Sequence, residues 1–174
     1  MMRLKRNFFN RDTLIVAQEL LGKYLVRKPG NKIIRAKITE TEAYCGQNDL
    51  ACHASKGLTK RTKVMFGPPG HAYIYLIYGM YHCLNIVTEK EGYPAAVLIR
   101  GLQLDGCGGP GKLCRQFKID KNLNGVDMCK SREIWIESAS RRKGEKPSGI
   151  KKGKRIGVDY AGKWKNKFWR FYID

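Results

Sequence analysis

The sequence predicts a single compact domain of the mixed α/β (α+β) class, in which a curved, mostly antiparallel sheet carries flanking helices and a protruding β-hairpin. Three observations predict this class. The length of 174 residues suits one domain, covering residues 1–174. Two segments, 32–44 and 132–138, alternate polar and apolar residues as half-buried strands do. A tyrosine-rich apolar segment at 71–89 is interrupted by Tyr78–Gly79, which is typical of a hairpin turn.

The first part of the chain combines a helix, a strand and a long loop. Residues 11–26 are typical of an amphipathic helix, with Asp12 as its N-cap and Gly22 as a stop signal. The strand at 32–44 follows. Residues 45–66 are polar and punctuated by glycine, which predicts a loop containing at most one turn of helix near Asp49–His53.

The second part of the chain adds strands and basic segments. An apolar strand is predicted over 92–105, and a glycine-rich turn leading into a helix is predicted over 106–119. Residues 139–155 contain eight Lys and Arg against one acidic residue, which predicts an exposed, mobile loop. Four aromatic residues near the end are expected in the core or at an interface: Trp164, Phe168, Trp169 and Phe171.

The charge balance predicts a polyanionic partner. There are 34 Lys and Arg against 15 Asp and Glu, a formal net charge of +19. Nucleic acid is the simplest such partner, ahead of an anionic membrane surface, and a merely soluble basic protein is the alternative. The opening MMRLKRNFF has no secretory pattern, and no segment approaches the length of a membrane span. A soluble, intracellular protein is expected, in the cytoplasm or nucleoid of a bacterium or the nucleus of a eukaryote.

The cysteines do not indicate a metal site. The six are Cys45, Cys52, Cys83, Cys107, Cys114 and Cys129. No two form a CxxC pair, and the histidines do not complete a zinc-site spacing. Reduced thiols that behave as small buried hydrophobes are expected, with no metal and no cofactor.

Two carboxylates in the 32–44 strand are the first candidates for chemistry. If the strand alternates regularly, Ala36, Ile38, Glu40, Glu42 and Tyr44 share one face. The apolar start of that face predicts that it points inward. Because burying a carboxylate is costly unless it is partnered or has a task, Glu40 and Glu42 are singled out.

Other candidates each have a structural alternative. Arg100 ends a row of alternating residues in its strand and suits a fixed contact with a carboxylate or phosphate, or a structural ion pair with Glu40 or Glu42. His53, which precedes a basic run, is either functional or an ordinary satisfied histidine. Tyr78 and Met80 flank the hairpin tip, where apolar groups suit a wedge between base pairs unless the hairpin packs inward.

Four long motifs carry a family resemblance. TETEAY, MFGPPGHAYIYLIYGMYHCLN, AAVLIRG and GPGKL occur in this order, and the sequence resembles the alkyladenine (3-methyladenine) DNA glycosylases of the alkylpurine-excising type. The resemblance covers most of the chain and implies a monomeric enzyme that flips a damaged purine out of duplex DNA and hydrolyses its N-glycosidic bond. It implies the following roles: Glu42 as the base that activates water, Arg100 as the residue that helps to hold this water and the nearby phosphate, Tyr44, His53, Tyr75 and Asn85 as pocket residues, and Tyr78 with Met80 as the intercalating pair.

One departure and two other functions stay open. The run GLTKRTKVMF lacks the proline–arginine pattern common in the family, so Lys60 and Lys63 stand where other residues are expected. A non-catalytic nucleic-acid-binding module would explain the charge but not a set of inward Glu, Tyr and His side chains. An assembly protein that docks its basic loops on an acidic partner would show no preference for damaged DNA.

Overall fold

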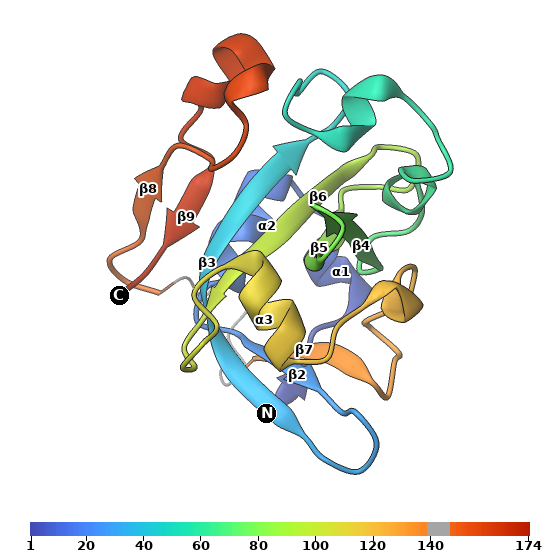
Figure 1. Ribbon diagram of the computed structural model, residues 1–174, viewed down its shortest axis with the longest axis vertical. Helices are drawn as coiled ribbons and strands as arrows, with labels where there is room; N and C mark the ends of the chain where they lie inside the picture. The colour runs from blue at the N-terminus through green and yellow to red at the C-terminus, as the bar shows by residue number, and fades with distance from the viewer. Residues whose placement is uncertain (139–146) are drawn as a thin grey trace.

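An antiparallel sheet forms the body of the computed structural model, which describes residues 1–138 and 147–174. The strands follow one another in the order β1-β7-β2-β3-β6-β5-β4, with β9 beside β3 and β8 beside β9. The long strand β3 pairs with β2 and β9 along one edge and with β6 along the other (Figure 1). The sheet curls around this strand, so the predicted class, a curved and mostly antiparallel sheet with flanking helices, is confirmed.

The elements are short, apart from β3. The strands are β1 (Met2–Arg3), β2 (Tyr24–Arg27), β3 (Ile34–Cys45), β4 (Ala72–Ile77), β5 (Tyr81–Thr88), β6 (Ala95–Leu102), β7 (Ile134–Ser138), β8 (Lys151–Gly153) and β9 (Arg170–Tyr172). The helices are α1 (Arg6–Phe9), α2 (Thr13–Leu20) and α3 (Pro110–Gln116), with 3₁₀ turns η1 (His53–Lys56), η2 (Lys63–Phe66), η3 (Lys121–Leu123) and η4 (Asp159–Asn166). In the parts of the chain that the structure describes, none of the helices has the length and apolarity that a bilayer span requires.

The predicted helix over 11–26 is correct only in its first half. Asp12 caps α2 by accepting a hydrogen bond from the backbone N–H of Ile15 at 3.0 Å, as expected. The helix ends at Leu20, and Gly22, with φ of 77°, turns the chain. The segment Tyr24–Arg27 is strand β2, because β3 and β7 on either side supply its hydrogen bonds. Sheet pairing over long range therefore overrides the local helical pattern.

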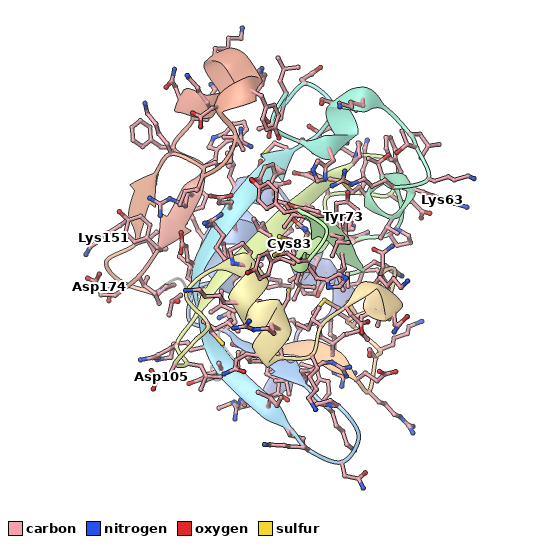
Figure 2. All side chains as sticks on the ribbon, in the orientation of Figure 1. Lys63, Tyr73, Cys83, Asp105, Lys151 and Asp174 are labelled. Carbon is pink, nitrogen blue, oxygen red and sulfur yellow. The ribbon has the colours of Figure 1, made fainter. Side chains whose placement is uncertain are left out.

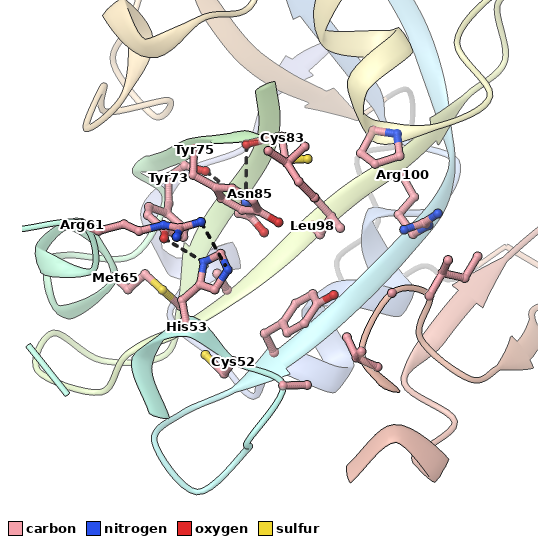
Figure 3. A pocket seen from close by; sticks show the side chains of 18 of the residues that line it. Cys52, His53, Arg61, Met65, Tyr73, Tyr75, Cys83, Asn85, Leu98 and Arg100 are labelled. Carbon is pink, nitrogen blue, oxygen red and sulfur yellow. Dashed lines mark hydrogen bonds between the residues drawn. The ribbon is translucent and has the colours of Figure 1, made fainter. Parts of the chain in front are cut away.

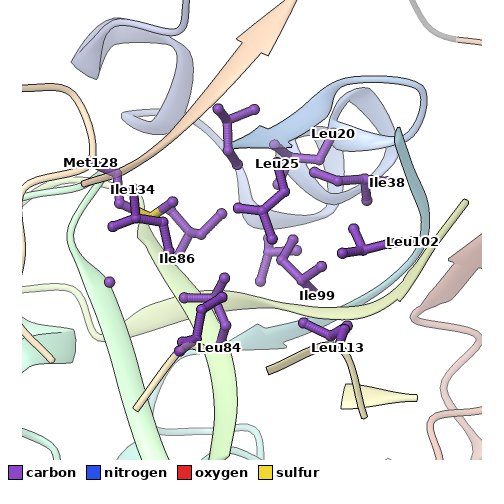
Figure 4. Packing of buried hydrophobic residues seen from close by; sticks show 14 of the residues in the cluster. Leu20, Leu25, Ile38, Leu84, Ile86, Ile99, Leu102, Leu113, Met128 and Ile134 are labelled. Carbon is purple, nitrogen blue, oxygen red and sulfur yellow. The ribbon is translucent and has the colours of Figure 1, made fainter. Parts of the chain in front are cut away.

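The core lies between the sheet and the two longer helices. Helix α2 packs against β3 and β6, and α3 packs against β5 and β6. Figure 4 shows the buried side chains that meet there, among them Leu20 of α2, Ile38 of β3, Ile99 of β6 and Leu113 of α3. Cys114 lies in the same core, where burial raises the pKa of its thiol, as expected for a cysteine that acts as a small hydrophobe.

The described part of the basic segment 139–155, which was predicted as an exposed loop, contains a strand. Residues 139–146 lie outside the described residues. Beyond them, Lys151–Gly153 forms strand β8 against β9, and Figure 2 shows Lys151 beside Asp174, with 2.7 Å between the ammonium and the carboxylate. Arg155, which was counted among the exposed cations, is only 5% exposed. The prediction is wrong here because a run of charges does not reveal that one member has a buried acidic partner.

Candidate active site

Halfway along β3, the side chains that point to the core change from even-numbered to odd-numbered residues. This change decides where Glu42 points. Ile38 belongs to the core. The register then shifts between Ile38 and Glu40 and again between Glu40 and Thr41. A β-bulge inserts an unpaired residue, so the side chains beyond it alternate with the opposite parity. Gly101 permits this close crossing, since a Cβ at that position would lie 3.1 Å from the Cβ of Glu40.

Beyond the bulge, the odd-numbered side chains of β3 face the core. Thr41 is fully buried and donates its hydroxyl to a carbonyl of α2 at 2.9 Å, and Ala43 lies in the core cluster. Glu42 and Tyr44 therefore point to the opposite side of the sheet. The expectation that Ile38 and Glu42 share one face is wrong, because the bulge lies between them.

Glu42 is a fully buried carboxylate with a partner on each oxygen. Its Oε2 accepts a hydrogen bond from the Tyr44 hydroxyl at 2.8 Å, and its Oε1 accepts one from the backbone N–H of Ile156 at 2.8 Å. The Nε of Arg100 lies 3.5 Å from Oε1. Burial raises the pKa of Glu42 above its usual value, and the positive charge of Arg100 opposes that rise. The result is a carboxylate that is fixed in place and disposed to accept a proton.

Arg100 joins the two carboxylates that the sequence singled out. Its Nε lies 3.3 Å from Oε1 of Glu40, closer than it lies to Glu42. Glu40 also accepts a hydrogen bond from Nη1 of Arg170 at 2.9 Å. The arginine is therefore held by Glu40 on one side and faces Glu42 on the other. Only 13% of its side chain is exposed, and the exposed part borders a cavity.

In front of Glu42 lies a cavity of about 370 Å³ (Figure 3). Most of the predicted site residues line it, from four separate parts of the chain. They are Tyr44, His53, Tyr75, Tyr78, Asn85 and Arg100. Glu42 itself lies directly behind Tyr44 and Arg100, and Met80 does not reach the cavity wall. Most of the residues singled out in the sequence thus lie around one cavity in the folded chain.

One wall of the cavity is a cluster of aromatic rings. The rings of His53 and Tyr75 meet edge to face with centroids 4.5 Å apart, and those of Tyr73 and Tyr75 lie 5.6 Å apart. Nδ1 of His53 is 2.9 Å from the Tyr73 hydroxyl. The guanidinium of Arg61 lies 5.0 Å from the centre of the Tyr75 ring, over its face. Figure 3 shows Arg61 reaching toward His53 from the loop before η2.

His53 is expected to be neutral at pH 7. Its burial, and secondarily the charges of Arg61 and Lys56, lower its pKa to about 4. Since the ordinary value is about 6.5, protonation favours the unfolded chain, and this residue's contribution to stability is lost as the pH falls from about 6.5 to about 4. An NMR titration of the imidazole, assigned with His53→Gln, measures the midpoint. A midpoint near 6.5 would contradict the buried geometry.

Asn85 closes the floor of the cavity between the strands of the hairpin. Its side chain is 3% exposed, and its Nδ2 donates to the Tyr73 carbonyl at 3.1 Å. The amide is therefore held in one orientation by the backbone of the neighbouring strand β4. A fixed amide at a cavity floor can distinguish ligands by the donors and acceptors on their edges.

The hairpin β4–β5 projects its tip into solvent. Tyr78 and Gly79 both have positive φ, of 52° and 70°, as a tight hairpin turn requires. Tyr78 is 84% exposed and Met80 is 67% exposed. The alternative that the hairpin packs inward is wrong. Tyr78 also lines the cavity, so this exposed ring stands at the cavity mouth, with Met80 beside it on the hairpin tip.

Comparison with known proteins identifies the family. The sequence profile of the methylpurine-DNA glycosylases matches residues 7–174.

The chain belongs to the methylpurine-DNA glycosylase family.

Relatives of this glycosylase occur in archaea and bacteria. A protein of Methanocella arvoryzae is 51% identical over 97% of this chain and 91% of its own length. A protein of Legionella pneumophila (strain Corby) is 52% identical over 99% and 95%, and one of Clostridium perfringens (strain SM101) is 43% identical over 99% and 96%. Each carries the name "Putative 3-methyladenine DNA glycosylase". The resemblance inferred from the motifs is confirmed, and with it the expectation of a DNA glycosylase.

Sequence reasoning missed several features of the glycosylase cavity. Tyr73 could have been found, because it alternates with Tyr75 along β4. Arg61 carried only the general signal of a basic run. The segment Ile156–Val158 and Tyr160, which form the wall opposite the hairpin, carried no signal, because they come from a distant part of the chain.

Proposed function

We propose that this glycosylase excises alkylated or deaminated purines from duplex DNA. It flips the damaged base into the cavity and hydrolyses the N-glycosidic bond with a water that Glu42 activates, which leaves an abasic site. One observation carries the proposal: a buried carboxylate, held by two hydrogen bonds and an arginine, lies behind a cavity walled by aromatic rings. Residues 1–174 act as one catalytic domain, as a monomer on DNA.

The reaction needs a carboxylate next to the sugar. The bond from C1′ to the purine nitrogen breaks, its electron pair leaves with the base, and the oxygen of water bonds to C1′. Positive charge develops on the sugar, and the ionised Glu42 stabilises that charge and takes the proton of the water. A cationic alkylated purine leaves as a neutral base, which makes it a good leaving group. A neutral deaminated purine leaves as an anion and takes up a proton from the solvent.

Glu42 keeps free acceptor positions for the water. A carboxylate has about four acceptor positions, and the Tyr44 hydroxyl and the Ile156 amide occupy one on each oxygen. Because the carboxylate is fully buried, a water reaches one of its free lone pairs from the cavity only when Tyr44 or Arg100 shifts. Arg100 orients this water and contacts the neighbouring phosphate, while Glu40, which Arg170 also binds, holds the guanidinium in place.

The aromatic wall binds the flipped base. Tyr44, His53 and Tyr75 surround it, and their faces attract a cationic purine through cation–π contact. A neutral His53 avoids the repulsion that an imidazolium would exert on such a base. Asn85, fixed by the Tyr73 carbonyl, screens purines by the exocyclic group that they present to the cavity floor.

The hairpin tip acts on the duplex. Tyr78 with Met80 enters the minor groove and fills the gap that the flipped nucleotide leaves, which offsets part of the cost of unstacking. The net charge of +19 supplies affinity for the phosphate backbone without sequence preference. Genomic DNA as substrate implies that the enzyme works inside the cell.

The test is single-turnover excision from a duplex oligonucleotide carrying one hypoxanthine or one 7-methylguanine. We expect abasic product from a damaged strand, free base in equal amount, and a strand break only after alkali, as for a monofunctional hydrolase. The undamaged duplex is the control. Tight binding of both duplexes with no abasic product from either lesion would overturn the proposal in favour of a non-catalytic binding module.

A further inference from the structure

An ion pair is sealed inside the wall behind Glu42. The side chains of Asp49 and Arg155 are both 0% exposed, and they meet through two hydrogen bonds of 2.5 and 2.9 Å. Asp49 also accepts the backbone N–H groups of Cys45 and Ala51, each at 3.1 Å. The pair therefore ties the turn that follows β3 to the segment that precedes η4.

The guanidinium is bound on further sides by the backbone. Arg155 donates to the carbonyl of Ala43 at 2.9 Å and to that of Trp164 at 3.2 Å. Its Nε is buried with no hydrogen-bond partner among the described residues. Buried ion pairs are weak devices for stability, and an unpartnered N–H makes this one weaker still. Because burying this ion pair costs desolvation free energy, we look for a role of the pair other than stabilising the fold.

Both hydrogen bonds of Glu42 come from groups that touch Arg155. The first donor, the N–H of Ile156, belongs to the next residue along the chain. The second donor is the hydroxyl of Tyr44, and the Arg155 guanidinium lies 4.9 Å from the centre of the Tyr44 ring. Moving the guanidinium would therefore move both donors, although Arg155 itself does not bond to Glu42.

We propose that the Asp49–Arg155 pair is a positioning device for Glu42. It fixes the Ile156 amide and the Tyr44 hydroxyl so that the carboxylate keeps one orientation toward the cavity. Because the pair has no net charge, it acts through geometry, whereas the charges that act directly on Glu42 are those of Arg100 and, in the opposite direction, Glu40. The proposal rests on the proposed role of Glu42 as the base.

A purely structural pair makes a different prediction. Its removal would lower the melting temperature and leave the titration of Glu42 unchanged. A positioning pair sets how well the two donors reach the carboxylate. Since hydrogen bonds to the charged form hold the pKa of a carboxylate down, loosening them raises the midpoint at which Glu42 titrates.

The first variant is Asp49→Leu/Arg155→Met, which removes both charges together and leaves no buried charge unpaired. The matched control is Arg11→Met/Glu19→Leu. It removes a part-buried ion pair of 2.8 Å between Arg11, which precedes α2, and Glu19 on α2, and neither residue contacts Glu42 or lines the cavity. Arg155→Lys keeps the charge but loses the flat guanidinium under Tyr44, and it serves if the double variant does not fold.

Two readouts are taken on each folded variant. The first is the titration of the Glu42 carboxyl carbon by NMR, assigned with Glu42→Gln, and the second is the pH profile of single-turnover excision. We expect the Asp49–Arg155 variant to raise both midpoints by about one pH unit, the size of one charged hydrogen bond, and to slow excision about tenfold. The control should change neither.

The outcomes separate the two proposals. Unchanged midpoints in both Arg155 variants, with the melting temperature lowered, would overturn the positioning role and leave the proposed function intact. If the wild-type enzyme excises neither lesion, the proposed function fails, while the NMR midpoint still decides whether the pair positions Glu42.

Discussion

Replacement of Glu42 by Gln is expected to slow single-turnover excision about 10³-fold, within the range that a positioned general base contributes. The substitution preserves shape: the new amide oxygen still accepts the Ile156 N–H, and the Tyr44 hydroxyl can turn to accept from the new amide nitrogen. The fold and the cavity should therefore persist, and only the proton acceptor and the negative charge beside the sugar are lost. The measurement is the rate of abasic-site formation with enzyme in excess.

The pH dependence of excision tests the same role of Glu42 in a second way. Wild-type excision should fall as the pH falls through the pKa of Glu42, and burial sets that midpoint above the ordinary value of 4.5. Glu42→Gln should lack this limb. The matched control is Glu40→Gln, which changes the other carboxylate beside Arg100. The Glu40 side chain is 24% exposed, and we expect its replacement to slow excision less than tenfold. A wild-type rate for Glu42→Gln would end the assignment of the base.

The sequence predicted that Glu42 is buried, and the structure buries it, but on the other face of the sheet. Regular alternation put it on the face of Ile38, whereas the bulge at Glu40 turns it to the opposite face. Both arguments end with a buried carboxylate, so the error did not change the choice. A bulge has no reliable local signature, and only Gly101 on the partner strand, which admits the close approach, hints at it.

Features that depend on a few neighbouring residues were predicted well. The hairpin follows from the left-handed backbone of Tyr78 and Gly79, and the helix start follows from the Asp12 cap. Features that depend on distant partners were not. Tyr24–Arg27 became a strand only because two other strands flank it, and Arg155 looked like a surface charge because its partner, Asp49, is 106 residues away. The sequence therefore did not predict the cavity wall that holds Glu42.

The hairpin tip should matter only when the substrate is a duplex. The double change Tyr78→Ala/Met80→Ala is expected to slow excision from a duplex roughly 10- to 100-fold, because one stacking contact is worth about 1–3 kcal/mol and the wedge replaces the stacking lost on flipping. A lesion in single-stranded DNA needs no gap filled, so its excision should change little. Since both side chains are largely exposed, the melting temperature should stay near that of the wild type.

A matched control separates the wedge from a general loss of apolar surface. The exposed fraction of Ile33, 59%, is similar to that of Met80. Ile33 belongs to the loop between β2 and β3, which lies at the end of the molecule opposite the η1 loop (Figure 1). Ile33→Ala should leave both substrates unaffected. If the tip variant slows single-stranded and duplex excision equally, Tyr78 acts as part of the cavity wall that it also lines, and the intercalating role would have to be abandoned. If duplex excision alone falls, the loss measures what the wedge contributes to keeping the damaged base out of the stack.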